Sequence, residues 1–213
     1  TTNTAPTGSE SYTDVAGVSE ALTSLTGSTT YYWWVRSDCG ASTYSGWLTG
    51  GSFTTECDPT VAFPASEPFA SYLPSTCWKE GLNGDLTAGP ASTGASLNSW
   101  TGDDFANIGS SFVGSAKYNM YQANNNAWLI SPSYSVPASP AHRMTYDVAA
   151  TNFAATSAVT NWEADDYVEV LISTSGMTNW TVIETYNASN VPSNTGQGEV
   201  VDLTSYAGQT VRF

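Results

Sequence analysis

Alternating apolar and polar side chains predict an antiparallel hairpin over residues 165–186. Val168, Val170 and Ile172 alternate there with side chains of mixed polarity. A period of two places one face of a strand inward and the other outward. A Ser/Thr/Gly turn follows, and a second apolar segment begins at Trp180. Such turn residues between two strand-like segments are typical of a hairpin.

A second hairpin is predicted nearer the N-terminus. β-branched and aromatic residues dominate residues 29–37, with Tyr31, Trp33 and Val35 on one face. These residue types are enriched in strands. Residues 51–55 form the predicted return strand.

Shorter apolar runs predict further strands, at residues 127–132, 144–148, 199–203 and 209–213. The Gly/Asn/Ser-rich residues 81–99 are predicted to be loops, and residues 100–105 a turn that carries Asp103 and Asp104. Every candidate amphipathic helix is interrupted by Gly, Asn or Pro within two turns. The predicted fold class is therefore all-β.

Composition limits the partners of the chain. Its 213 residues suffice for one large or two small domains, and 19 acidic against 5 basic residues give a net charge of -14. This charge opposes nucleic acid and anionic membranes, because phosphate binding needs clustered Lys and Arg. No apolar run approaches the roughly 20 residues that span a bilayer, so we expect no membrane insertion. An acidic, Lys-poor chain rich in Trp, Thr, Asn and Gly is typical of secreted or cell-surface β proteins.

The N-terminal motif LTGSTTYYWWVRSDCG…YSGW…GSFTTEC resembles the last strands of a bacterial fibronectin type III domain. The match covers residues 1–57, and its step from Leu25 to Tyr31 resembles the tyrosine corner of that family. The resemblance implies that earlier strands of such a domain precede Thr1. Residues 58–68 form a Pro-punctuated linker, which we expect to be stiff.

The remaining motifs occur in the order EPF…LP…CW…AWLISPS…DDYVEVLISTSG…WTVIETY…VDLTSYAGQTVRF. This order resembles the cleaved-adhesin and MAM-like jelly-roll domains of secreted bacterial surface proteins. The resemblance implies a jelly-roll β-sandwich over residues 69–213. Domains of this kind usually continue past the equivalent of Phe213, so the resemblance also predicts one further strand, with an acidic residue in it.

The resemblance to MAM-like domains also implies a structural calcium ion. Glu67 matches the acid before the first jelly-roll strand, and Asp165 and Asp166 match the acids at the hairpin entrance. Asp147 approaches from the predicted neighbouring strand. The resemblance brings Glu67 and Asp165 together at one corner, where carboxylates would suit calcium. The alternative is that these are ordinary solvated acids at strand ends.

Three cysteines cannot all pair with one another. Cys39 and Cys57 would lie roughly 30 Å apart along one hairpin at about 3.4 Å per residue, too far for a disulfide. We therefore predict a Cys57–Cys77 disulfide across the linker, and a partner for Cys39 in the upstream strands. The alternatives are three free thiols, or a zinc site, for which the chain offers no CxxC and only His142.

The sequence does not predict an enzyme. Glycoside hydrolysis needs two carboxylates facing one cleft, whereas the adjacent acids at 103–104 and 165–166 would point to opposite faces of a strand. The single histidine, His142, lies in a Pro-flanked loop, and no GxSxG motif accompanies it.

Carbohydrate binding is a stronger expectation, because Trp and Tyr rings can stack on sugars. Trp100 and Trp162 are the predicted ligand contacts, since both lie in polar surroundings. Tyr118, Tyr121 and Trp180 are further candidates. Aromatic residues of β-sandwiches are more often core, and we expect this of Trp78 and Trp128.

The predicted function is a non-catalytic adhesion module of a multidomain bacterial surface or secreted protein. It would bind glycan or protein ligands beside neighbouring modules, with calcium making it rigid. One alternative is a carbohydrate-binding accessory module of a secreted hydrolase or peptidase. Another is a structural spacer or filament repeat that self-associates through open sheet edges.

Overall fold

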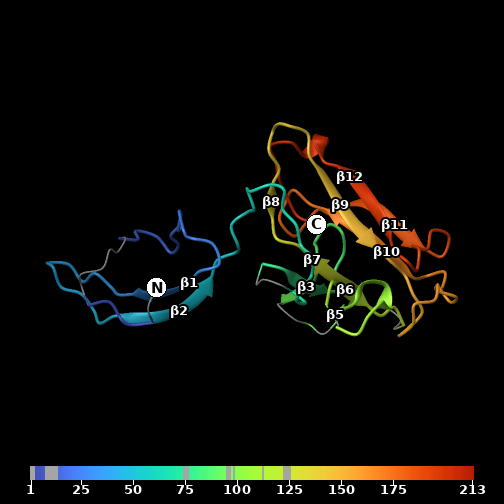
Figure 1. The fold of residues 1–213 in the computed structure, drawn as a ribbon. Coiled ribbons are helices and arrows are strands. Elements are labelled where there is room, and N and C mark those ends of the chain that lie inside the picture. The colour runs from blue at the N-terminus through green and yellow to red at the C-terminus, as the bar shows by residue number, and fades with distance from the viewer. Residues whose placement is uncertain are drawn as a thin grey trace. The chain divides into compact units, whose positions relative to one another are not determined.

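The computed structural model describes residues 3–7, 14–73, 77–94, 97, 99–111, 113–121 and 126–213. The chain divides into two compact units, unit 1 (Thr1–Asp58) and unit 2 (Pro59–Phe213). Over the described ranges it forms β-strands and two short 3-10 turns and no α-helix (Figure 1). The predicted all-β class is confirmed. No helix of these ranges has the length and apolar character needed to cross a membrane.

Unit 1 contains the predicted N-terminal hairpin. β1 (Thr30–Val35) pairs antiparallel with β2 (Leu48–Thr54), with Tyr31 opposite Phe53 and Val35 opposite Leu48. The register shifts between Trp33 and Trp34, which marks a β-bulge. The faces are as predicted, because Tyr31 and Phe53 stack with ring centroids 5.7 Å apart.

Two contacts brace this hairpin. The Thr26 N–H donates to the Tyr31 hydroxyl at 2.9 Å. The Arg36 guanidinium lies over the rings of Tyr44 and Trp47, at 3.8 Å and 4.5 Å from their centroids. Both contacts hold a turn or loop against the ribbon.

The cysteines follow the predicted pairing. Cys57 and Cys77 form a disulfide, and Cys39 is an exposed free thiol. Cys39 lies in a tight turn, where its N–H donates to the Thr43 carbonyl at 2.9 Å. Its predicted upstream partner stays a prediction.

Unit 2 is built from antiparallel strand pairs in two groups (Figure 1). One group contains β9 (Arg143–Val148) paired with β12 (Gln197–Asp202), and β10 (Tyr167–Ile172) paired with β11 (Thr181–Asn187). The other contains β3 (Lys79–Leu82), which lies between β4 (Ser92–Gly94) and β7 (Ala127–Ile130), and β5 (Trp100–Asp103) paired with β6 (Ser115–Tyr118). β8 (Tyr134–Ser135) pairs with β13 (Thr210–Val211). The 3-10 turns are η1 (Phe105–Asn107) and η2 (Thr204–Tyr206).

The C-terminal core confirms the inward face of the predicted 165–186 hairpin. Val136, Ile172, Leu203 and Val211 form a buried cluster, against which Phe213 packs. Ile172 is 1% exposed. β10 is tied to the end of the chain by a bridge between residues 173 and 212. The core therefore sits where β8, β10 and β13 meet.

The predicted loops over residues 81–99 and the predicted turn at 100–105 are wrong in part, because β3, β4 and β5 run through them. Glycine is required at Gly81, where an added Cβ would lie 2.6 Å from Pro90 Cβ and 3.2 Å from Trp128 Cβ. The strand forms because it pairs with β4 and β7 on both sides. Tertiary pairing outweighs the weak strand propensity of glycine.

Candidate functional site

A wide cleft of about 2860 Å³ in unit 2 collects most of the residues that the sequence singled out. Its wall combines aromatic rings with acids and amides. Both predicted ligand contacts, Trp100 and Trp162, line it. So do all four predicted calcium ligands, Glu67, Asp147, Asp165 and Asp166.

Trp100 presents an aromatic surface with an unused donor. It begins β5 and pairs across the sheet with Tyr118 of β6, the ring centroids lying 5.5 Å apart. Its indole N–H is buried and has no hydrogen-bond partner among the described residues. A buried donor without a partner costs about 1–3 kcal/mol, and the indole N–H of the core residue Trp180 is in the same state.

A buried carboxylate, that of Glu80, holds the chain segment directly before Trp100 in place. Glu80 of β3 is fully buried, and its Oε2 accepts hydrogen bonds from the Leu97 N–H at 2.8 Å and from the Ser99 N–H and Oγ at 3.2 and 2.9 Å. The Tyr72 hydroxyl donates to its Oε1. Burial pushes the pKa of Glu80 up, but the hydrogen bonds from Tyr72, Leu97 and Ser99 outweigh burial and hold the pKa below its ordinary value. The residue directly before Trp100 is thus anchored to β3.

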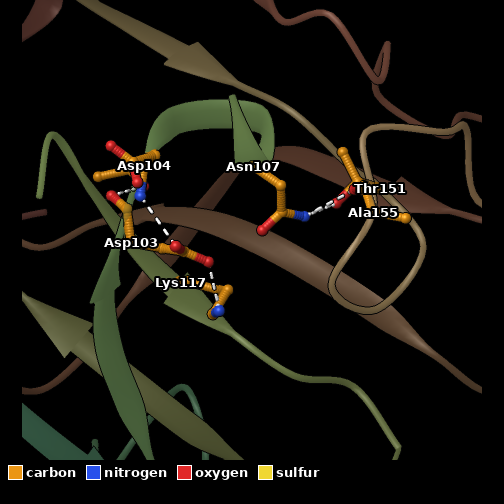
Figure 2. A network of polar contacts seen from close by, with 7 residues as sticks. Asp103, Asp104, Asn107, Lys117, Thr151 and Ala155 are labelled. Atoms are coloured by element: carbon orange, nitrogen blue, oxygen red, sulfur yellow. Dashed lines mark hydrogen bonds and ion pairs between the residues drawn. The ribbon is translucent and has the colours of Figure 1, made fainter. Parts of the chain in front are cut away.

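The β5–β6 hairpin is held by a second buried acid, as Figure 2 shows. Asp103 forms an ion pair with the partly exposed Lys117. Its Oδ1 accepts from the Asp104 N–H at 2.9 Å, and its carbonyl accepts from Ser115 Oγ at 2.8 Å. Asp103 and Asp104 therefore organise the turn, and Asp103 does not project as a solvated charge.

Trp162 differs from Trp100 in its donor. It is half-buried, and its indole N–H donates to the Asp166 carbonyl at 2.9 Å, which closes the turn before β10. Only the ring of Trp162 is left to contact a ligand. Trp180, another candidate, is a core residue: it is 6% exposed and packs on Trp128 at 5.8 Å. Tyr121 is 77% exposed and also lines the cleft.

Two tyrosines of the cleft wall supply hydroxyl groups that remain neutral. The hydroxyls of Tyr146 and Tyr186 are 2.9 Å apart. Burial is the main cause that raises the pKa of both, and the nearby carboxylates of Glu184 and Glu199 raise it further. At neutral pH this pair can donate and accept hydrogen bonds without carrying charge.

The predicted calcium ligands all line the cleft, but their local surroundings differ. Glu67 lies near Tyr134 of β8: burial raises the pKa of Tyr134, and the charge of Glu67 raises it further. Asp165 and Asp166 lie directly before β10, and Asp147 lies in β9.

The described side chains do not by themselves form a calcium cage. Over the described ranges no three His, Cys, Asp or Glu side chains lie close enough to hold one metal ion. Glu67 is engaged locally, because its Oε1 accepts from the Phe69 N–H at 2.7 Å. Calcium binding stays a prediction.

Three residues of this site escaped the sequence analysis: Glu80, Asn107 and Lys117. Charged residues are rarely buried, so nothing but the alternation around Glu80 could have indicated an inward carboxylate. Asn107 lies in a turn segment with a nearby glycine, and such a pattern indicates the backbone conformation but not a side-chain contact. Lys117 is one of only five basic residues in the chain, so the rarity of positive charge was the one feature of the sequence that could have drawn attention to it.

Comparisons of the chain with known protein families, with curated proteins and with solved structures found no match.

Proposed function

We propose that this chain is a non-catalytic, extracellular adhesion module of a multidomain bacterial surface or secreted protein, and that its cleft binds a neutral glycan. The observation that carries this proposal is the surface of Trp100 and Tyr118. It combines two aromatic rings that line the cleft with their centroids 5.5 Å apart. A sugar offers apolar C–H faces that stack on such rings.

Charge supports a neutral ligand. The chain carries a net charge of -14, and the acids of the cleft wall outnumber its bases. Lys117 is already paired with Asp103. A sulfated or uronate-rich glycan would meet like charge at close range, which lowers both its affinity and its rate of association.

The state of Asp103 removes one cleft carboxylate from the candidates for glycoside hydrolysis. A glycosidase needs a pair of carboxyl groups available to the substrate, one as acid and one as nucleophile or base. The oxygens of Asp103 are engaged by Lys117 and by the Asp104 N–H. Its role in this arrangement is to hold the turn. The Cys57–Cys77 disulfide is compatible with an oxidising, extracellular compartment.

The test is a glycan array followed by calorimetry. The array carries neutral, sulfated and uronate-containing glycans, and we expect signal on neutral ones. Replacing Trp100 by Ala should weaken binding about tenfold or more, equivalent to about 1.4 kcal/mol. Trp33→Ala is the matched control, because Trp33 is an exposed indole of unit 1 outside the cleft. An array without signal, or equal affinities of the two variants, would contradict the proposal.

The same cleft would serve a carbohydrate-binding accessory module of a secreted hydrolase or peptidase. The two roles differ in what accompanies the module. A catalytic domain encoded beside residues 1–213 would favour the accessory role, and repeated copies of these units would favour adhesion.

A structural spacer or filament repeat is a second candidate, supported by the ribbon of unit 1. Trp33, Val35 and Leu48 lie on one face of β1–β2 and are 46%, 49% and 67% exposed. An apolar face of this kind marks a contact surface in many proteins. Ordered polymers in sedimentation and electron microscopy would support the spacer, whereas a monomer at every concentration would remove it.

A further inference from the structure

One amide joins the Trp100 hairpin to the segment that leads to Trp162. Asn107 ends η1, and its Nδ2 donates to Thr151 Oγ1 at 2.5 Å and to the Ala155 carbonyl at 2.8 Å (Figure 2). Asn107 and the preceding Ala106 both have positive φ, of 57° and 58°. Asparagine tolerates this left-handed conformation better than most residues. The turn thereby directs the amide out of the hairpin.

The segment that receives this amide is itself braced. The Asn152 Nδ2 donates to Ser157 Oγ at 3.1 Å and to the Ala158 carbonyl at 2.9 Å, and the Thr160 N–H donates back to Asn152 Oδ1 at 3.3 Å. Residues 151–160 therefore form a cross-linked loop. The Trp162 turn, closed by its own indole N–H, follows directly.

The hairpin on the other side of the amide is equally fixed. Glu80 anchors the residue before Trp100, and the Asp103–Lys117 ion pair locks β5 to β6. Two hydrogen-bonded segments thus meet at the side chain of Asn107: the hairpin that carries Trp100, and the loop that directly precedes Trp162. Loss of the hydrogen bonds from Asn107 would therefore change the distance between Trp100 and Trp162, while the contacts around each tryptophan would stay largely the same.

The volume of the cleft indicates the size of the ligand that could contact both tryptophans. Pockets for drug-sized ligands occupy about 300–1,000 Å³, whereas this cleft is about 2860 Å³. A single sugar ring would leave most of it filled with water. Trp100 and Trp162 both line this cleft, so a chain-like ligand that extends along it can contact both.

We propose that the cleft binds an extended neutral oligosaccharide at two separate subsites, Trp100 and the Trp162 turn, and that Asn107 is a positioning residue that sets their spacing. This inference rests on the proposed glycan-binding function. It adds that affinity grows with chain length, because a second contact made by the same ligand is intramolecular.

The test uses the full chain and calorimetry with cello-, xylo-, manno- and malto-oligosaccharides of two to six units. In the wild type we expect affinity to rise with length in at least one series and then to level off. Asn107→Asp preserves shape and tolerance of positive φ, but it replaces the donating amide by a carboxylate. We expect it to weaken binding of the longest oligosaccharide about tenfold, while binding of the disaccharide stays within a factor of two.

Asn194→Asp is the matched control. Asn194 Nδ2 donates to the Thr156 carbonyl at 2.8 Å, so the variant breaks a bond to the same loop and adds the same charge without touching the hairpin. We expect it to keep the wild-type length profile. Thr151→Val removes the acceptor Oγ1 from the other side and should reproduce the Asn107→Asp profile, even where Asn107→Asp itself fails to fold.

The possible outcomes separate the two proposals. If the wild type binds none of the neutral oligosaccharides, both proposals fail. If the wild type binds but Asn107→Asp and Thr151→Val keep its length profile, or lose affinity equally for the disaccharide and the longest chain, the spacing role of Asn107 fails and glycan binding stands.

Discussion

Two hairpins of this chain share one local pattern and differ in everything around them. β1–β2 in unit 1 and β10–β11 in unit 2 are both antiparallel, and each carries one shift of register. Trp33 of β1, which lies beside the register shift, is 46% exposed, whereas Ile172 of β10 is 1% exposed. Apolar alternation thus states which side chains share a face, but only the rest of the fold decides whether that face is covered.

The largest expected difference is in the core. Ile172→Ala should lower the free energy of unfolding of unit 2 by about 2–5 kcal/mol, because it leaves a cavity among buried side chains. Val35→Ala removes a comparable apolar group from the exposed ribbon and should cost within about 0.5 kcal/mol. Urea unfolding measures both. Equal losses would mean that the unit 1 face is covered in solution.

Glu80 allows the same comparison of a buried with an exposed side chain to be made for a polar group. Glu80→Gln should destabilise unit 2 by about 1–3 kcal/mol at neutral pH, because an amide cannot accept from all of the donors that now surround the carboxylate. Tyr121→Phe, in which an exposed hydroxyl is lost, should be nearly silent.

The pH dependence of the same variant tests the charge. Because the folded pKa of Glu80 lies below its ordinary value of 4.5, its contribution is complete above about pH 4.5 and is lost as pH falls through the folded pKa. Urea midpoints at pH 7 and pH 3 should therefore differ more in the wild type than in Glu80→Gln. Parallel pH profiles would show that folding does not lower the pKa of Glu80.

Calcium is expected to give the smallest change. If Asp165 contributes to a calcium site, calcium at ten times its dissociation constant should stabilise unit 2 by about 1.4 kcal/mol relative to chelator. Asp165→Asn should remove this shift. Glu67→Gln tests the second predicted ligand, and it should reduce the shift if Glu67 binds the same ion. Identical melting in calcium and in chelator would eliminate the site.

The sequence predicted those strands whose side chains carry their own signal. β1, β7, β9 and β10 are rich in β-branched and aromatic residues, and all were expected where they occur. β3 and β5 contain glycine and charged residues, and they become strands because β4, β7 and β6 pair with them. The pairing strands are distant in the sequence, so a local pattern of residues cannot predict β3 and β5.

The candidate site divides in the same way. Trp100 and Trp162 were predicted from their polar surroundings, and both line the cleft. Trp180 has similar neighbours in the sequence, but the close approach of Trp128 buries it. The role of Asn107 depends on Thr151 and Ala155, more than forty positions away, so no reading of its immediate neighbours could have revealed it.

The seam between β8 and β13 has a kinetic consequence. Tyr134 pairs with Val211, and Ser131 exchanges hydrogen bonds of 2.9 and 3.0 Å with Phe213. Loop closure over such separations is slow. Unit 2 therefore cannot complete its core until residues near 211 have left the ribosome, so its earlier strands remain without their C-terminal partners until synthesis of this segment is finished.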